Sequence, residues 1–220
     1  MLFSIVVPAC NIAPYAPAMI DSIKAQTFSD FEAVIINEES SDGSFPALEK
    51  AIGGDRRFKL IPKPRSGSAS ASRNYGIDHA NGEYLVFLDG DDSLQPDALE
   101  RFAGIIRTEH PDIIMSAIRC WNEQPDGTLA PKELWSLGRE GEIFATGIDA
   151  MLARDNLEKN WIPQSGMNVF RTALIRDKQL YQAVGRMHQD DEWTYRVFME
   201  AGKVVGSEYP YYNYRRNPNS

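Results

Sequence analysis

The sequence has 220 residues, which suits one large domain or one domain with a small appendage. Hydrophobic residues make up 43% and charged residues 25%, an ordinary globular composition that argues against long disorder. The net charge of −8 disfavours a nucleic-acid binder and suits a protein whose carboxylates hold a divalent cation.

The two cysteines and the N-terminal segment indicate in which cellular compartment the protein is expected. Cys10 and Cys120 lack a CxxC spacing, which excludes a disulfide framework, disfavours a zinc site and makes a reducing cytoplasm the default. The N-terminal MLFSIVVPAC has no basic region, and Pro8 interrupts its apolar run, so we expect a buried strand there and not a targeting segment. No stretch approaches the ~20 apolar residues that span a bilayer.

The first half of the chain alternates between strand and helix patterns. Strands are predicted at 4–8, 31–36, 58–61 and 84–88, and helices at 14–26, 44–52, 68–80 and 96–107. Ser44 is a candidate N-cap, and Gly53 and Gly54 are expected to end the second helix. The run YLVFL is continuously apolar, as a parallel strand covered on both faces requires. This alternation predicts an α/β fold with a parallel, doubly wound sheet.

The second half is less regular. We expect a strand at 112–120, a loop or hairpin at 123–141, a helix at 146–156, a helix at 191–201 and a strand at 203–205. Residues 161–175 mix Trp, Pro, Gly and Asn before a short apolar run, and no element is assigned to most of them.

The acidic segment Asp89-Gly90-Asp91-Asp92 follows the fourth predicted strand. Ligands of a parallel sheet bind outside the carboxyl ends of its strands. Mg²⁺ and Mn²⁺ take one or two carboxylates together with substrate phosphates, so this Asp-x-Asp is a candidate metal site. The structural alternative is a solvated acidic turn that caps the next helix.

Two further segments carry candidate chemistry. His188-Gln189-Asp190-Asp191-Glu192 precedes a predicted helix, where acidic residues are favoured by the helix dipole alone. A carboxylate there is also a candidate general base that takes a proton from a substrate hydroxyl. In SASASRNYG, Arg73 is the only cation, and either close helix packing or a ligand contact explains the run.

The chain resembles the inverting, family 2 glycosyltransferases with the GT-A fold over nearly its whole length. The resemblance is carried by SIVVPACNIAPYAPAMIDSIKAQTFSDFEAVIINEESSDGS, SASASRNYGIDHANGEYLVFLDGDDSLQPDALE and HQDDEWTYRVFMEAGKVVGSEYPYYNYRRNPNS. It implies one GT-A domain with a Rossmann-like, mostly parallel sheet flanked by helices. Residues 1–118 would form the nucleotide-sugar-binding half and 119–220 the acceptor-binding half.

The resemblance also implies donor contacts in the first half of the chain. Pro8, Ala9 and Asn11, after the first strand, would line the nucleotide pocket. Glu38 stands where relatives usually have an aspartate that contacts the base or ribose. Independently of the resemblance, Arg73 is a candidate donor contact on the helix that follows the third strand.

The carboxylates receive separate roles from the same resemblance. Asp89 and Asp91 match the Asp-x-Asp motif, with Asp91 the expected ligand of Mn²⁺ or Mg²⁺ and Asp89 nearer the ribose. Asp190 matches the expected catalytic base, with Asp191 in reserve.

Three residues of the second half complete this set. Asn168 falls in the region that helps shape the acceptor side. Tyr212 and Arg215 match a segment that closes over the donor, with Arg215 a candidate diphosphate contact or, equally, a solvated arginine.

Three departures from the family pattern stand out. Asn37-Glu38-Glu39 replaces the usual two aspartates and a glycine, which leaves the nucleotide open. Gln189 replaces the acidic residue before Asp190, which loosens the register of the base. The sequence stops after PNS, where relatives often continue, so a C-terminal truncation is expected.

The expected function is therefore metal-dependent, inverting transfer of a hexosyl group from a nucleoside diphosphate sugar, a UDP-sugar by preference. The acceptor would be a glycan or glycolipid of surface polysaccharide assembly, with peripheral membrane association at the inner face of the membrane. Two alternatives remain: a non-catalytic nucleotide-sugar-binding module of the same fold, and a haloacid-dehalogenase-type phosphohydrolase in which Asp89 is a nucleophile and Asp91 an acid.

Overall fold

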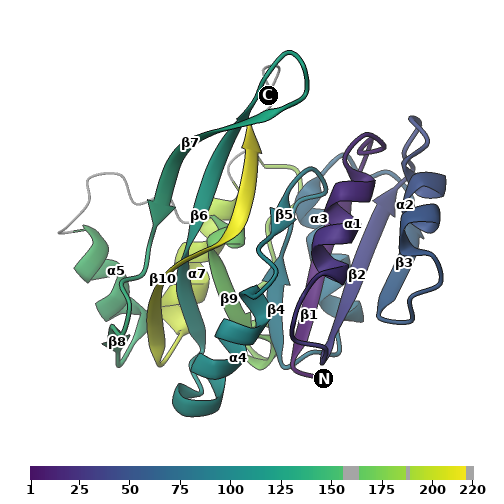
Figure 1. The fold of residues 1–220 in the computed structure, drawn as a ribbon. Helices are drawn as coiled ribbons and strands as arrows, with labels where there is room; N and C mark the ends of the chain where they lie inside the picture. The colour runs from purple at the N-terminus through teal and green to yellow at the C-terminus, as the bar shows by residue number, and fades with distance from the viewer. Residues whose placement is uncertain (156–163, 187–188, 217–220) are drawn as a thin grey trace.

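The structure is a computed structural model that describes residues 1–155, 164–186 and 189–216 (Figure 1). In the first half, the strands are largely continuous apolar runs, and each is followed by a turn and usually by a helix that packs on the sheet. In chain order these elements are β1 (Phe3–Ala9), α1 (Ala16–Lys24), β2 (Phe31–Glu38), α2 (Ser44–Ile52), β3 (Phe58–Lys63), α3 (Ala69–His79), β4 (Tyr84–Phe87), β5 (Ser93–Leu94) and α4 (Ala98–Glu109).

In the second half, strands outnumber helices among the described residues. The elements are β6 (Ile113–Glu123), β7 (Leu129–Ser136), β8 (Ile143–Phe144), α5 (Gly147–Asp155), the 3₁₀ turn η1 (Ser165–Met167), β9 (Asn168–Arg171), α6 (Thr172–Asp177), α7 (Gln189–Glu200) and β10 (Val204–Arg216). Residue 156 of the helix expected at 146–156 and residues 161–163 lie outside the described residues.

All the described strands belong to one sheet with the order β3-β2-β1-β4-β9-β6-β10-β5, to which β7 and β8 attach at β6 and β10. The pairs β3-β2, β2-β1, β1-β4 and β6-β10 are parallel, whereas β9 runs antiparallel between β4 and β6. Helices α1 and α4 lie in front of the sheet and α3 and α7 behind it (Figure 1). The expected α/β fold with a mostly parallel sheet flanked by helices is confirmed.

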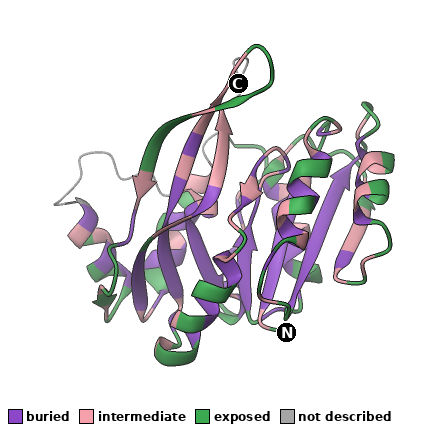
Figure 2. Ribbon diagram, in the orientation of Figure 1, coloured by how far each residue is buried: buried purple, intermediate pink, exposed green. Residues whose placement is uncertain are grey.

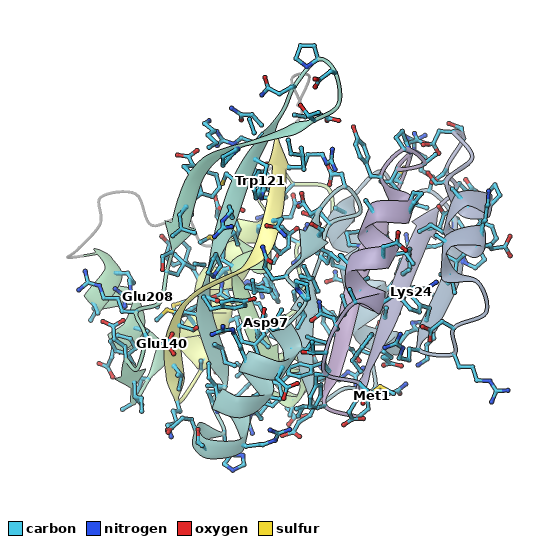
Figure 3. All side chains as sticks on the ribbon, in the orientation of Figure 1. Met1, Lys24, Asp97, Trp121, Glu140 and Glu208 are labelled. Carbon is cyan, nitrogen blue, oxygen red and sulfur yellow. The ribbon has the colours of Figure 1, made fainter. Side chains whose placement is uncertain are left out.

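The core lies along the sheet, whose central strands are buried, whereas β7 and the outer faces of the helices are largely exposed (Figure 2). The carboxyl ends of the parallel strands meet at one edge because neighbouring strands are in register: Val6 pairs with Phe87, and Ala9 pairs with Asn37. Met1 lies at the opposite edge, where β1 begins, and Trp121 lies near the end of β6 (Figure 3).

The small residues predicted to allow close packing of α3 do so at Gly76. A Cβ atom there would lie 2.4 Å from the Cγ1 of Val6, so only glycine lets this helix approach β1 so closely. The prediction that Ser44 caps α2 is wrong in detail. Gly43, with φ +89°, is the N-cap, and Ser44 is the first helical residue, with its hydroxyl bonded to Asp42 and accepting the N–H of Ile12.

The largest differences from the sequence-based elements occur late in the chain. The strand expected at 203–205 continues to Arg216, the last described residue, because its polar continuation pairs with β6. The segment at 123–141 is a hairpin in which β7 pairs with β6. Three short strands, β5, β8 and β9, were not predicted.

Candidate active site

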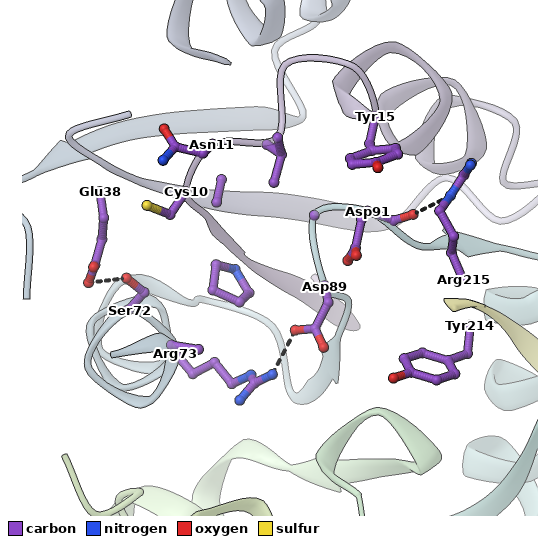
Figure 4. A pocket seen from close by; sticks show the side chains of 15 residues that line it. Cys10, Asn11, Tyr15, Glu38, Ser72, Arg73, Asp89, Asp91, Tyr214 and Arg215 are labelled. Carbon is purple, nitrogen blue, oxygen red and sulfur yellow. Dashed lines mark hydrogen bonds and ion pairs between the residues drawn. The ribbon is translucent and has the colours of Figure 1, made fainter. Parts of the chain in front are cut away.

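A cavity of about 440 Å³ opens at the carboxyl edge of the sheet, between the segments that follow β1, β2 and β4 (Figure 4). Its walls include all eight residues predicted to contact the nucleotide sugar or the metal: Pro8, Ala9, Asn11, Glu38, Arg73, Asp89, Asp91 and Arg215. Cys10, Ile12, Tyr15, Ala69, Ser72, Gly90 and Tyr214 complete the lining. The structure thus gathers the predicted residues, and their individual roles stay predictions.

Asn11 fixes the conformation of the segment after β1. This residue has a positive φ of 54°, which asparagine adopts more readily than most residues. Its backbone N–H donates to the hydroxyl of Ser40 at 3.0 Å, and its side-chain oxygen accepts the N–H of Ser41 at 2.9 Å. The two loops that follow β1 and β2 are therefore tied together at the cavity wall.

Glu38 is the last residue of β2, and its carboxylate is bonded to other side chains of the protein. The hydroxyl of Ser72 donates to it at 2.6 Å, Lys63 pairs with it at 2.9 Å, and Ser66 donates through both its hydroxyl and its N–H. Burial opposes ionisation, but these hydrogen bonds outweigh it and lower the pKa of Glu38 to about 2. In this structure Glu38 supports the wall that α3 and the end of β3 provide.

The acidic turn, residues 89–92, follows β4 directly. A Cβ at Gly90 would lie 2.8 Å from Ile12, so glycine lets the turn pass close under the first loop. Burial first, and the charge of Asp89 next, raise the pKa of Asp91. Burial and the charges of Asp91 and Asp89 raise the pKa of Asp92 well above its ordinary value. The turn therefore concentrates negative charge that a cation would stabilise.

Tyr212 holds the acidic turn from below. Its ring is 3% exposed, its hydroxyl donates to Asp92 at 2.6 Å, and the same hydroxyl accepts the N–H of Asp89 at 3.1 Å. Asp92 in turn accepts the backbone N–H of Arg215 at 2.6 Å. Tyr212 was expected to close over the donor, but it lies beneath the turn and does not line the cavity.

Arg73 links the two acidic segments. One of its terminal nitrogens bonds Asp89 at 2.6 Å and the other bonds Asp190 at 2.9 Å, while its own side chain is 5% exposed. Desolvation would lower the pKa of Arg73, yet the charges of Asp89 and Asp190 raise it above its ordinary value. The acidic turn after β4 and the start of α7, distant in sequence, therefore face one buried cation.

Asp190 also accepts a hydrogen bond from the hydroxyl of Ser165 at 3.2 Å. Burial raises the pKa of Asp190, and the charge of Arg73 opposes this rise. Asp190 and Asp191 are both only partly buried, and neither lines the cavity. His188, which opened the predicted acidic segment, lies outside the described residues.

Arg215 and Tyr214 bring the end of β10 into the cavity wall. The guanidinium of Arg215 lies 4.9 Å from the ring centre of Tyr15, donates to the carbonyl of Asp91 and pairs with Glu123 at 3.2 Å. It is thus fixed at the acidic turn and is not a free solvated arginine. Asn168 is fully buried, donates to the carbonyl of Gln164 and does not line the cavity.

Sequence reasoning missed Tyr214, Tyr15 and Ser165 as parts of this site. Alternation along YYNYRR could have suggested Tyr214, since it shares a strand face with Tyr212. No local pattern marks Tyr15 or Ser165, because each reaches its partner through tertiary packing.

The donor set fits a hard divalent cation. Asp89 and Asp91 offer carboxylate oxygens from one turn, and such cations commonly take one or two carboxylates and complete their shell with phosphate and water. Within residues 1–155, 164–186 and 189–216, no three His, Cys, Asp or Glu side chains form a cage that would hold a metal without a ligand. Any such ion would share its coordination with a bound substrate.

The comparisons with known proteins agree with this fold and show the family of the chain. The model of the family "Glycosyl transferase family 2" matches residues 4–185, and the chain belongs to this family. The expectation of a glycosyltransferase, rather than a phosphohydrolase, is thereby confirmed.

Relatives and solved structures cover the chain but are longer than it. Glycosyltransferase GlyG of Streptococcus pneumoniae is 24% identical over all of this chain and 72% of its own length. The crystal structure of Staphylococcus aureus TarS in complex with UDP-GlcNAc matches 98% of this chain and 59% of the TarS chain, with a TM-score of 0.79 and 23% identity. Mannosyltransferase PcManGT from Pyrobaculum calidifontis, in complex with GDP-Man and Mn²⁺, matches 97% of this chain and 56% of its own, with a TM-score of 0.65 and 13% identity. Of the described helices, none is long and apolar enough to cross a membrane.

Proposed function

We propose that this chain transfers a sugar from a nucleoside diphosphate sugar, preferably a UDP-sugar, to an acceptor hydroxyl with inversion of configuration. The observation that carries the proposal is the position of Arg73 between Asp89 and Asp190. It brings the expected donor-binding carboxylates and the expected base to the same side of the molecule. The UDP-GlcNAc of the TarS structure and the GDP-Man of the PcManGT structure support a nucleotide sugar as donor.

Donor binding would use the cavity between β1, β2 and β4. Asp91, with Asp89, would hold Mn²⁺ or Mg²⁺, and the Mn²⁺ of PcManGT supports this assignment. When bound, such an ion would neutralise the negative charge that grows on the leaving diphosphate. Arg73 and Arg215 add positive charge beside the same acidic turn, and Asn11 and the loop after β1 would flank the nucleoside.

Asp190 would act as the general base. The acceptor oxygen forms a bond to the anomeric carbon while the bond from that carbon to the diphosphate oxygen breaks, and the hydroxyl proton passes to Asp190. Burial favours this role, because it raises the pKa of Asp190 and makes the carboxylate a better proton acceptor. One displacement without an enzyme-bound sugar inverts the configuration.

The acceptor and the location follow from the same assignment. A glycan or glycolipid of surface polysaccharide assembly would supply the hydroxyl, and the reaction would take place in the cytoplasm, at the inner face of the membrane where the acceptor is a lipid. The free cysteines Cys10 and Cys120 suit a reducing compartment.

A donor screen tests the proposal. The chain is incubated with UDP-, GDP-, CDP- and dTDP-sugars and Mn²⁺ or Mg²⁺, and nucleotide release and melting temperature are measured. We expect one nucleotide class to raise the melting temperature in a metal-dependent way, since a ligand that binds only the folded state stabilises it, and its sugar to be slowly hydrolysed. Binding without any hydrolysis or transfer would favour a non-catalytic module, and no shift with any nucleotide at saturating metal would refute the proposal.

A further inference from the structure

Two aromatic rings lie side by side across β10, β6 and β7, and one of them lines the donor cavity. Tyr214 lines the cavity beside the acidic turn (Figure 4). The ring of Trp135 on β7 lies 6.0 Å from the ring of Tyr214, with an angle of 34° between their planes. We call Trp135 and Tyr214 the aromatic wall.

Strand register places both rings of the wall on one face of the sheet. Tyr214 pairs with Cys120 and Trp135 pairs with Ile118, and these two β6 residues are two positions apart. Side chains two apart on a strand point to the same face. Leu134 pairs with Arg119 and therefore belongs to the opposite face.

Polar groups flank the wall at its outer end. The guanidinium of Arg216 lies 5.0 Å from the ring centre of Trp135 and pairs with Glu133 at 3.2 Å. Both side chains remain accessible, at 34% and 40% exposure. Flat apolar area beside hydrogen-bond donors and acceptors matches a pyranose ring, which has a C–H face and a rim of hydroxyls.

The charged groups around the wall pair with one another. Arg216 and Lys132 both pair with Glu133, and Arg215 pairs with Glu123. The exposed aliphatic side chain of Leu134 lies on the opposite face of β7 and does not extend the aromatic wall. The wall therefore offers an acyl chain aromatic rings only.

We infer that the aromatic wall is an acceptor subsite, on which a neutral pyranose residue of a glycan acceptor stacks so that its chain end reaches the donor cavity. The inference rests on the proposed sugar transfer, and it names the acceptor class for that reaction. Tyr214 belongs both to the aromatic wall and to the lining of the donor cavity. A sugar stacked on Trp135 would therefore lie next to a sugar bound in the cavity.

Direct binding tests this subsite without any need for catalysis. Saturation-transfer NMR is recorded for the wild type with cellotetraose, chitotetraose and maltotetraose, each uncharged. We expect ring C–H protons of at least one tetrasaccharide to receive saturation, and Trp135→Ala to weaken its affinity about three- to tenfold, as loss of one stacked ring does. Trp135→Phe, which keeps a ring, is expected to restore most of that affinity.

Leu134→Ala is the matched control, because it shortens the neighbouring side chain on the opposite face of the same strand. It is expected to bind the sugar as the wild type does. Equal binding by Trp135→Ala and the wild type, or equal losses in Trp135→Ala and Leu134→Ala, would overturn the subsite. Binding of phosphatidylglycerol vesicles or a glycerol-phosphate oligomer through Trp135, with no tetrasaccharide bound, would overturn the glycan assignment.

Donor turnover separates this inference from the proposed function. If the donor screen succeeds, Trp135→Ala should raise the KM for the glycan acceptor about three- to tenfold, whereas Leu134→Ala should keep the wild-type acceptor KM and the wild-type rate of donor hydrolysis. If the screen fails while Trp135-dependent sugar binding persists, the transferase proposal fails and the sugar-binding surface stands. If turnover is present and Trp135→Ala leaves the acceptor KM unchanged, the wall is not the acceptor subsite.

Discussion

The two halves of the chain meet at Arg73 and the acidic turn but reach them by different routes. In the first half, β1, β2 and β4 are parallel neighbours, so the residues that follow them lie together at the carboxyl edge. In the second half, Asp190 arrives on α7, and Tyr214 and Arg215 arrive at the far end of the 13-residue strand β10. The proposed donor side is thus built from the ends of neighbouring strands, whereas the proposed base and the aromatic wall depend on contacts between distant parts of the chain.

The substitution with the largest expected effect tests whether α7 supplies the general base. Asp190→Asn keeps the shape of the side chain and removes its ability to take a proton, so transfer should fall about 10²- to 10⁴-fold. Nucleotide affinity, measured by calorimetry, should change little because Asp89, Asp91 and Arg73 remain. The matched control is Asp191→Asn, which should keep near wild-type turnover. Normal turnover of Asp190→Asn together with inactivity of Asp191→Asn would move the base by one residue.

The same contrast explains what could be predicted from the sequence. The strands around SIVVP, FEAVII and YLVFL follow from continuous apolar runs, and the sheet edge then brings Asn11, Glu38 and Asp89 to one cavity. The choice of Asp190 as candidate base came from a family motif. Its ion pair with Arg73 could be seen only in the structure.

The remainder could not be predicted because no local pattern encodes it. The final strand carries Glu208, Pro210 and two arginines, which are not typical of a strand. Its length therefore could not be predicted without knowledge of its pairing with β6. Tyr212 resembled a residue that covers the donor, and only the structure shows its hydroxyl beneath the acidic turn.

The next effect concerns stability on the donor side. The pKa of Glu38 is lowered from 4.5 to about 2, so its ionised form stabilises the folded chain above pH 4.5, and this contribution is lost as the pH falls toward 2. Glu38→Gln should therefore lower the free energy of unfolding by about 3 kcal/mol near neutral pH and by progressively less below pH 4.5.

Urea unfolding of both proteins, from pH 7 down to the lowest pH at which both stay folded, measures this difference. The exposed neighbour provides the control, since Glu39→Gln should change stability by no more than about 0.5 kcal/mol. A difference between wild type and Glu38→Gln that stays constant with pH would contradict the assigned role of the carboxylate.

The smallest effect tests the link between the halves, where β10 supports the acidic turn. Tyr212→Phe removes the hydroxyl that donates to Asp92 and accepts from the N–H of Asp89. The turn would then be held less firmly, and the Kd of the nucleoside diphosphate with Mn²⁺ should rise about fivefold, equivalent to about 1 kcal/mol.

Tyr211→Phe is the matched variant, because it removes a buried hydroxyl from the adjacent residue, where the partner is the carbonyl of Gly166 at 2.6 Å. Both variants should lose similar thermal stability, since each deletes one buried hydrogen bond. Only Tyr212→Phe should weaken nucleotide binding in calorimetric titrations. Equal weakening in the two variants would assign the effect to general loosening of β10, and wild-type affinity in Tyr212→Phe would show that the acidic turn keeps its geometry without the support of the second half.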